Sequence, residues 1–232
     1  MGNHIEYPIV VSDNIEEILK CVSFYKKEKK YDIMKNYLLK AIKLGNVKSM
    51  YKLARQYQRE LEFMYMIRYF EMAIEKKDTK SMLALGNYYR DIGDTSNMIK
   101  YYLIGKFNND VGCIFELAQY YRKIKDEDKM VEYYKFGSEN GHTESMFKLA
   151  QFYSFKKDFG LMVEYYTMAS DLGHIKSMYY LGNYYEQITD FEMMKKYYLL
   201  GIGKGDLSCM YALGSYEYEN LDYESMMKYY LQ

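Results

Sequence analysis

The chain has 232 residues, 49% of them hydrophobic, and it carries 32 Lys and Arg against 32 Asp and Glu. This balance gives no overall field that would attract nucleic acid or anionic lipid. No apolar run approaches the ~20 residues of a membrane-spanning helix, no signal-peptide pattern is present, and three widely spaced cysteines imply no disulfide framework. We therefore expect an intracellular, cytoplasmic protein without a membrane partner.

The first residues differ from the rest of the chain. Residues 1–15 include the only proline, Pro8, and show no periodic pattern, so we expect an irregular lead-in there. Residues 16–232 repeat with a strict period of 32 residues. The marker of the period is an apolar residue, found at Ile18, Met50, Met82, Ile114, Met146, Met178 and Met210. This recurrence predicts seven tandem repeats, the last of them incomplete.

Each repeat contains two apolar stripes with helical spacing. In the second repeat, Met50, Leu53 and Tyr57 fall on one helical face, and Met66 and Ala73 fall on another. We name the two helices of a repeat A and B. Because a single pair of helices cannot bury its own apolar face, the repeats are expected to stack and share a core.

Several positions recur in almost every repeat. Helix B carries a methionine in all seven repeats, at Met34, Met66, Met98, Met130, Met162, Met194 and Met226. Three residues later a tyrosine follows, at Tyr37, Tyr69, Tyr101, Tyr133, Tyr165, Tyr197 and Tyr229. A small residue in helix A, at Ala54, Gly86, Ala118, Ala150, Gly182 and Gly214, faces a small column in helix B. The sequence therefore predicts that these columns form a core in which backbones approach closely.

The residues between the helices fit the same scheme. An aspartate precedes helix B in five repeats, at Asp94, Asp126, Asp158, Asp190 and Asp222, where an acidic side chain caps a helix. Glycines such as Gly141 and Gly173 follow helix B, as expected for a C-terminal stop. His142 and His174 stand where Asn or Asp begins helix A in other repeats, so we interpret them as caps.

The pattern resembles known repeat families. Leu53-Ala54-x2-Tyr57 followed by Ala73 is similar to the tetratricopeptide repeat. The join Gly173-His174-Ile175-Lys176-Ser177-Met178-Tyr179-Tyr180-Leu181-Gly182 resembles the Sel-one-like repeat, although the loop between helices A and B is shorter than in that family. The resemblance implies an all-α, right-handed α-solenoid whose A helices line a concave face. The low-Pro, high-Tyr and high-Lys composition resembles Sel-one-like proteins of giant DNA viruses.

Catalytic and metal-binding patterns are absent from the sequence. There is no phosphate-binding glycine loop, no Cys-x-x-Cys, no His-Glu-x-x-His and no nucleophile elbow. His142 and His174 lie one period apart, but a metal site would need two more converging ligands. We therefore predict no enzymatic activity, no metal and no cofactor.

The binding surface is expected beside the core. By the tetratricopeptide resemblance, three columns of helix A would face a partner on the concave side. The predicted site residues are Tyr51, Arg55, Asn87, Arg90, Phe115, Gln119, Arg122, Phe147, Gln151, Tyr179 and Asn183. Amides can hold the backbone of an extended peptide while aromatic rings pack its side chains. This favours a non-catalytic scaffold that binds a protein or peptide.

Two other functions stay open. The first repeat is rich in lysine, which would suit an RNA-binding repeat, but such a protein needs basic residues along its whole groove, so nucleic acid is disfavoured. The chain could equally serve as an accessory subunit of an enzyme complex. Because no polar capping helix follows the last repeat, we also predict self-association through this end, near Met226, Tyr229 and Tyr230.

Overall fold

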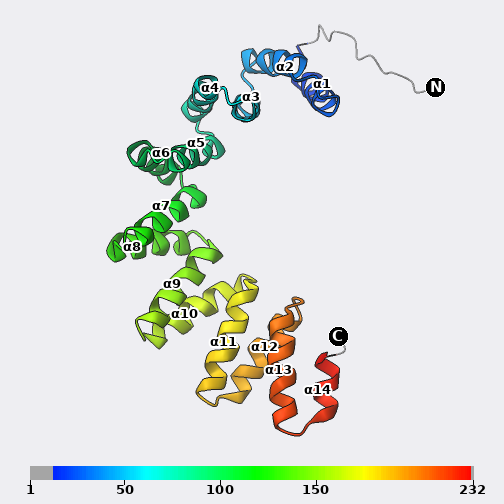
Figure 1. Cartoon of the computed structure of the whole chain (residues 1–232), viewed down its shortest axis with the longest axis vertical. Helices are drawn as coiled ribbons and strands as arrows, with labels where there is room; N and C mark the ends of the chain where they lie inside the picture. Colours follow the sequence, from blue (N-terminus) through cyan, green and yellow to red (C-terminus); the bar gives the residue numbers. More distant parts are fainter. Residues whose placement is uncertain (1–12, 231–232) are drawn as a thin grey trace, which may run out of the picture. The chain divides into compact units, whose positions relative to one another are not determined.

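The computed structural model describes residues 13–230 (Figure 1), with the side chains of Lys228 and Tyr230 excepted. This part of the chain contains fourteen α-helices and no strand, which confirms the predicted all-α solenoid fold. The helices are α1 (Ile15–Lys27), α2 (Tyr31–Lys43), α3 (Val47–Arg59), α4 (Phe63–Glu75), α5 (Thr79–Asp91), α6 (Thr95–Phe107), α7 (Val111–Lys123), α8 (Glu127–Glu139), α9 (Thr143–Phe155), α10 (Phe159–Asp171), α11 (Ile175–Gln187), α12 (Phe191–Ile202), α13 (Leu207–Glu219) and α14 (Tyr223–Tyr230).

The odd-numbered helices are the predicted A helices, and the even-numbered helices are the B helices. Most of the expected lead-in, residues 1–12, lies outside the described residues. So does the Tyr230 side chain of the predicted self-association surface. Within the described helices, none is long and apolar enough to cross a membrane.

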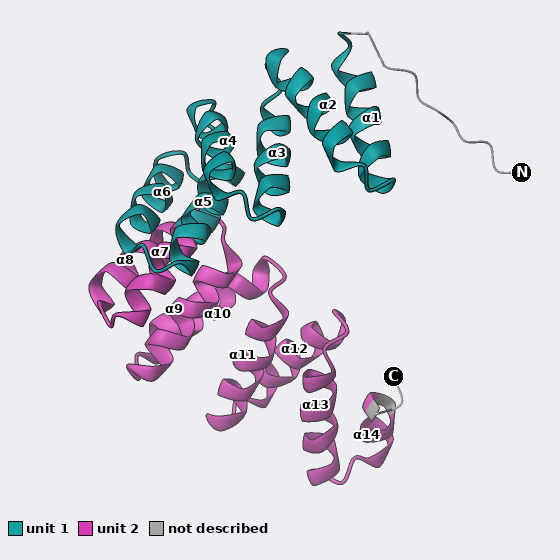
Figure 2. Cartoon of the chain, turned by 45° about the horizontal axis from the view of Figure 1, so that its top comes forward, with its two compact units in different colours: residues 1–113 teal, residues 114–232 magenta. Residues whose placement is uncertain are grey.

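The chain forms two compact units, unit 1 (residues 1–113) and unit 2 (residues 114–232), shown in Figure 2. Unit 1 contains α1 to α6 and the first residues of α7, and unit 2 contains the rest of α7 and α8 to α14. Each unit is a stack of neighbouring helices in which α3 packs on α2 and α4, and α11 packs on α10 and α12. Contacts between sequence neighbours are typical of a repeat array.

Local capping explains where the helices begin. The side chain of Asp94 accepts a hydrogen bond from the backbone of Asn97 at 3.0 Å, and Asp126, Asp158 and Asp190 cap their helices in the same way. His142 and His174 accept from the backbone of Ser145 and Ser177 at 3.3 Å, as predicted from their position. The first two B helices lack such a cap, because Lys30 and Glu62 occupy that position.

The turns within and between repeats use left-handed backbone. Gly141 and Gly173 end their B helices with φ of 76° and 85°, as the sequence predicted. In each repeat, one residue of the turn from helix A to helix B also has positive φ. In six of the seven repeats this residue is not glycine: Lys29, Leu61, Lys125, Lys157, Thr189 and Leu221. The left-handed residue of this turn could not be predicted from the sequence, because it is a glycine only at Gly93.

The core is built from the predicted columns. The helix B methionines from Met34 to Met194 are all buried, and Cys113 and Cys209 are buried as small core residues. The small columns allow the expected close approach: a Cβ added at Gly182 would lie 2.3 Å from the ring of Tyr198. A side chain at this position would therefore force the helices apart.

Pairs of stacked tyrosines recur inside six repeats. The rings of Tyr185 in helix A and Tyr197 in helix B lie 5.6 Å apart and almost parallel. Equivalent pairs are Tyr25–Tyr37, Tyr57–Tyr69, Tyr89–Tyr101, Tyr121–Tyr133 and Tyr153–Tyr165. In the seventh repeat Glu217 replaces the helix A tyrosine, is 6% exposed, and pairs with Lys195 at 2.9 Å. The stacked tyrosines thus link helix A to helix B in the first six repeats.

Candidate functional site

Grooves recur at one place in the repeat, between consecutive A helices. Each groove has a floor made by a buried methionine of helix B and by the residue four positions later. Its walls come from the two flanking A helices. The geometry follows from the period, because equivalent positions of successive repeats line equivalent grooves.

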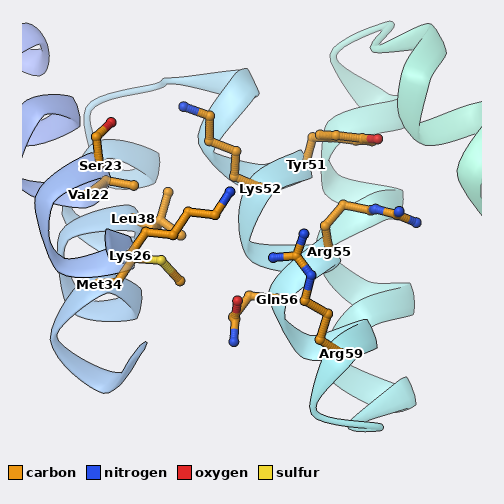
Figure 3. A pocket seen from close by; sticks show the side chains of 10 residues that line it. All are labelled: Val22, Ser23, Lys26, Met34, Leu38, Tyr51, Lys52, Arg55, Gln56 and Arg59. Carbon is orange, nitrogen blue, oxygen red and sulfur yellow. The ribbon is translucent and has the colours of Figure 1, made fainter. Parts of the chain in front are cut away.

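The α1–α3 groove lies in unit 1 and encloses about 330 Å³ (Figure 3). It is lined by Val22, Ser23, Lys26, Met34, Leu38, Tyr51, Lys52, Arg55, Gln56 and Arg59. Four of these residues are basic and none is acidic. In Figure 3, Lys26 reaches across from α1, whereas Arg55 and Tyr51 extend from α3 toward the opposite side. Arg55 donates a hydrogen bond to Gln58 on its own helix.

Unit 2 contains two grooves at equivalent positions. The α7–α9 groove encloses about 290 Å³ and is lined by Arg122, Lys125, Glu127, Met130, Tyr134, Lys148, Gln151, Phe152 and Phe155. The α9–α11 groove encloses about 440 Å³ and is lined by Gln151, Ser154, Phe155, Phe159, Met162, Tyr166, Tyr180, Asn183, Tyr184 and Gln187. Both grooves combine amides with exposed aromatic rings, which is the chemistry predicted for a peptide groove.

The amides of the predicted ladder are partly occupied by the fold. The hydroxyl of Tyr102 donates to Asn87 Oδ1 at 2.7 Å, and the hydroxyl of Tyr134 donates to Gln119 Oε1 at 2.7 Å. Burial raises the pKa of Tyr134 to about 12, so this hydroxyl keeps its proton at neutral pH. Because the oxygen of each amide already has a donor, its NH2 group is the part that remains for a partner.

The end of the ladder differs from its middle. The Tyr198 hydroxyl lies 2.6 Å from Asn183 Oδ1 and 2.8 Å from Glu186 Oε2, so its single proton serves one of them at a time. The side chain of Gln151 makes no hydrogen bond to any described residue, and Gln151 lines both the α7–α9 and the α9–α11 groove. Gln151 is therefore the ladder residue best placed to contact a ligand in unit 2.

The predicted basic residues are exposed and lie on different surfaces. Arg122 lines the α7–α9 groove. Arg90 instead pairs with the adjacent Asp91 at 3.1 Å and lines no groove of the described residues. Of the predicted site residues, the grooves bring together Tyr51 with Arg55, Arg122 with Gln151, and Gln151 with Asn183.

The predicted aromatic column is mostly turned toward the protein. Tyr51 packs against Phe70 with ring centroids 5.8 Å apart, and Phe115 packs against His142 at 5.0 Å. Phe147 is 4% exposed, so its side chain belongs to the core and has almost no surface for a partner. Tyr179 is half-buried beside Tyr198. The column loses exposure because each ring fills the space between two repeats.

The histidines act as helix caps. Nδ1 of His174 lies 2.9 Å from Ser177 Oγ, and Nε2 lies 3.4 Å from Glu144 Oε2. Burial lowers the pKa of both His142 and His174, and Glu144 opposes the shift. Across the described residues no three His, Cys, Asp or Glu side chains gather as a metal site would require.

Two features of this site could not be predicted from the sequence. The first is the tyrosine column at Tyr102, Tyr134 and Tyr198, whose hydroxyls bind the ladder amides. The 32-residue spacing of this column is evident in the sequence, but the direction in which its hydroxyl groups point is not. The second is Gln56, the only residue without an aromatic ring in a helix A column otherwise made of Phe24, Tyr88, Tyr120, Phe152, Tyr184 and Tyr216.

Comparison with known proteins shows the fold. No family model and no curated protein matches the chain. Among solved structures it is similar to a protective antigen of uropathogenic Escherichia coli with an SLR fold, at 20% identity, TM-score 0.61 and coverage of 80% of this chain. This chain spans only 44% of that antigen. The resemblance confirms the predicted architecture at a level where only the fold is comparable.

Two further structures support the same assignment. A Sel1 repeat protein from Oxalobacter formigenes matches at 19% identity and TM-score 0.57, over 82% of this chain and 85% of that protein. PilF of Pseudomonas aeruginosa matches at 12% identity and TM-score 0.56, over 87% of this chain and 97% of that protein. These proteins are bacterial, and the resemblance to giant-virus proteins stays a prediction.

Proposed function

We propose that this protein is a non-catalytic interaction scaffold that binds segments of protein partners in the grooves between its A helices. The observation that supports this proposal is the recurrence of one groove at three equivalent junctions. The positions that recur in every repeat are core or caps, whereas the groove walls vary. Variation on a constant frame is typical of a repeat protein that recognises an extended ligand.

The contents of the unit 2 grooves favour a peptide as ligand. Gln151 offers both a donor and an acceptor without an internal partner, and Asn183 lies in the same groove. Phe155 and Phe159 line that groove as well and are 79% and 48% exposed. Amides of this kind can bind a peptide backbone while the rings cover apolar side chains.

The test is selection of peptides from a displayed random library with the full chain as bait. The selected peptides are then titrated against the wild type and against Gln151→Ala/Asn183→Ala. We expect the double variant to bind about tenfold more weakly, as loss of hydrogen bonds in a desolvated contact predicts. Lys176→Ala, an exposed change on α11 that lines no described groove, is the matched control.

Two results would oppose the proposal. Peptides whose affinity is equal for the wild type and the double variant would show that they bind elsewhere. Binding of single-stranded RNA that falls steeply with salt, in the absence of peptide binding, would favour an RNA-binding repeat. The same selection therefore separates the two classes of ligand.

A further inference from the structure

The α1–α3 groove differs from its equivalents in charge. Lys26, Lys52 and Arg59 line it, and none of them has an ion pair with a described residue. In the α7–α9 groove, by contrast, the equivalent of Lys52 is Lys148, which pairs with Glu144 at 3.1 Å. The cations of the α1–α3 groove can therefore bind an anion without breaking an internal pair.

One buried polar atom in the same groove has no partner. Gln56 is 3% exposed, and its Oε1 accepts no hydrogen bond within the described structure. Its Nε2 donates to Glu60 Oε1 at 2.9 Å, and Glu60 is held in turn by Lys35 at 3.0 Å. The carboxylate of Glu60 accepts only, so it fixes the amide with the nitrogen toward Glu60 and the oxygen on the other side.

The groove thus combines basic side chains that have no carboxylate partner with an amide oxygen that has no hydrogen-bond donor. An unpaired buried oxygen is unfavourable, which makes a ligand N–H at this position favourable. The floor of the groove is apolar, formed by Val22, Met34 and Leu38. Figure 3 shows Gln56 below Lys26, with Arg59 rising from α3 into the same space.

We propose that the α1–α3 groove binds an acidic residue of a partner peptide. The carboxylate of that residue would pair with Lys26 and Arg59, and its backbone N–H would donate to Gln56 Oε1. A single acidic residue in a peptide carries both groups, the side-chain carboxylate and the backbone N–H. A nucleic-acid phosphate offers acceptors but no donor at the same group, so the donor requirement favours the peptide. This inference rests on the proposed scaffold function and assigns a ligand class to one groove.

The test is an NMR titration of the full, 15N-labelled chain with the capped dipeptide Ac-Glu-Glu-NH2. We expect saturable shifts of the Gln56 side-chain amide and of Arg59 Nε–H. The neutral dipeptide Ac-Gln-Gln-NH2, sodium acetate and a short oligo(U) are titrated in parallel. Arg59→Phe, which copies Phe155 of unit 2, should bind the acidic dipeptide about tenfold more weakly, and Gln56→Met about threefold more weakly.

Control variants separate this effect from loss of structure. Arg59→Gln removes the charge at an exposed position and should weaken binding as Arg59→Phe does. Lys27→Ala removes an exposed cation outside the groove and should bind as the wild type. Equal shifts with the neutral dipeptide, equal affinity for acetate alone, or tighter binding of oligo(U) at these resonances would each overturn the proposal.

The two proposals can fail independently. If selected peptides bind the unit 2 grooves but the α1–α3 groove ignores the acidic dipeptide, only the present inference is lost. If the acidic dipeptide binds unit 1 but no selected peptide depends on Gln151 and Asn183, the assignment of the unit 2 grooves is lost.

Discussion

The α1–α3 groove of unit 1 and the α7–α9 groove of unit 2 occupy the same place in the repeat, three periods apart. Lys26 corresponds to Arg122, Lys52 to Lys148, and Arg55 to Gln151. Their floors match as well, with Met34 and Leu38 in one groove and Met130 and Tyr134 in the other. The frame of the two grooves is therefore the same.

Besides the change from Arg55 to Gln151, the main difference lies at two further positions of the wall. Gln56 and Arg59 in unit 1 correspond to Phe152 and Phe155 in unit 2. The α7–α9 groove is also lined by a carboxylate, that of Glu127, which pairs with Lys156 at 2.7 Å. The α1–α3 groove is thus more cationic and the α7–α9 groove more aromatic. A repeat array can change its ligand class at one junction without disturbing the core, because neighbouring repeats share only their own interface.

The largest expected effect concerns the helix A column that contains Tyr51 and Phe147, because its burial differs between the two units. Phe147 is in the core of unit 2, whereas the equivalent Tyr51 is half-exposed in unit 1. We expect Phe147→Ala to lower the free energy of unfolding by about 3–5 kcal/mol and Tyr51→Ala by about 1–2 kcal/mol. Urea titration followed by hydrogen exchange measures both, because repeat arrays open in parts. Equal losses would show that the two junctions are packed alike.

The second expected effect is a difference in the pH dependence of stability between the helix A caps of unit 1 and those of unit 2. Helix A begins with Asn46 or Asp78 in unit 1 and with His142 or His174 in unit 2. Burial lowers the pKa of both histidines from the usual 6.5, so the unfolded chain binds more protons as the pH falls below that value. The stability they contribute is therefore present above pH ~6.5 and is lost below it, by about 1 kcal/mol per lost cap.

The measurement is urea unfolding of the wild type and of His142→Asn/His174→Asn between pH 7.5 and 5, conditions set by the ~6.5 pKa of free histidine. The groups facing His174 are Glu144, Lys148 and Lys176, and their charges are unchanged in the variant. The asparagine variant should lose less stability than the wild type over this range. Parallel pH curves would mean that the histidines have the same pKa in the folded and the unfolded state.

The smallest effect concerns Gln56 itself. Gln56→Met keeps the length of the side chain and removes a buried oxygen without a partner, but it also removes the hydrogen bond from Gln56 Nε2 to Glu60, so we expect the protein to gain at most about 1 kcal/mol of stability. Gln58→Met, on the same helix but half-exposed, is the control and should change stability little. A gain in stability together with weaker binding of the acidic dipeptide is the combination expected of a functional residue. A clear loss of stability would indicate a structural role for Gln56.

Much of the architecture could be predicted from the sequence because the repeat multiplies each signal. A methionine or an aspartate that recurs every 32 residues marks core or cap without further evidence. The histidine caps followed from their positions in the period. The grooves were harder to predict, since the periodic pattern does not say which residue beside the core turns toward solvent.

The sequence by itself determined the period, the helical pairs and the inward columns, because hydrophobic spacing dictates which face of a helix is buried. Only the tertiary structure decided the side-chain partners: the tyrosine hydroxyls that hold Asn87 and Gln119, the burial of Phe147, and the unpartnered oxygen of Gln56. These depend on the distances between packed helices, which packing sets to within a few tenths of an ångström. The side-chain partners therefore follow from how the helices pack, which the periodic pattern does not encode.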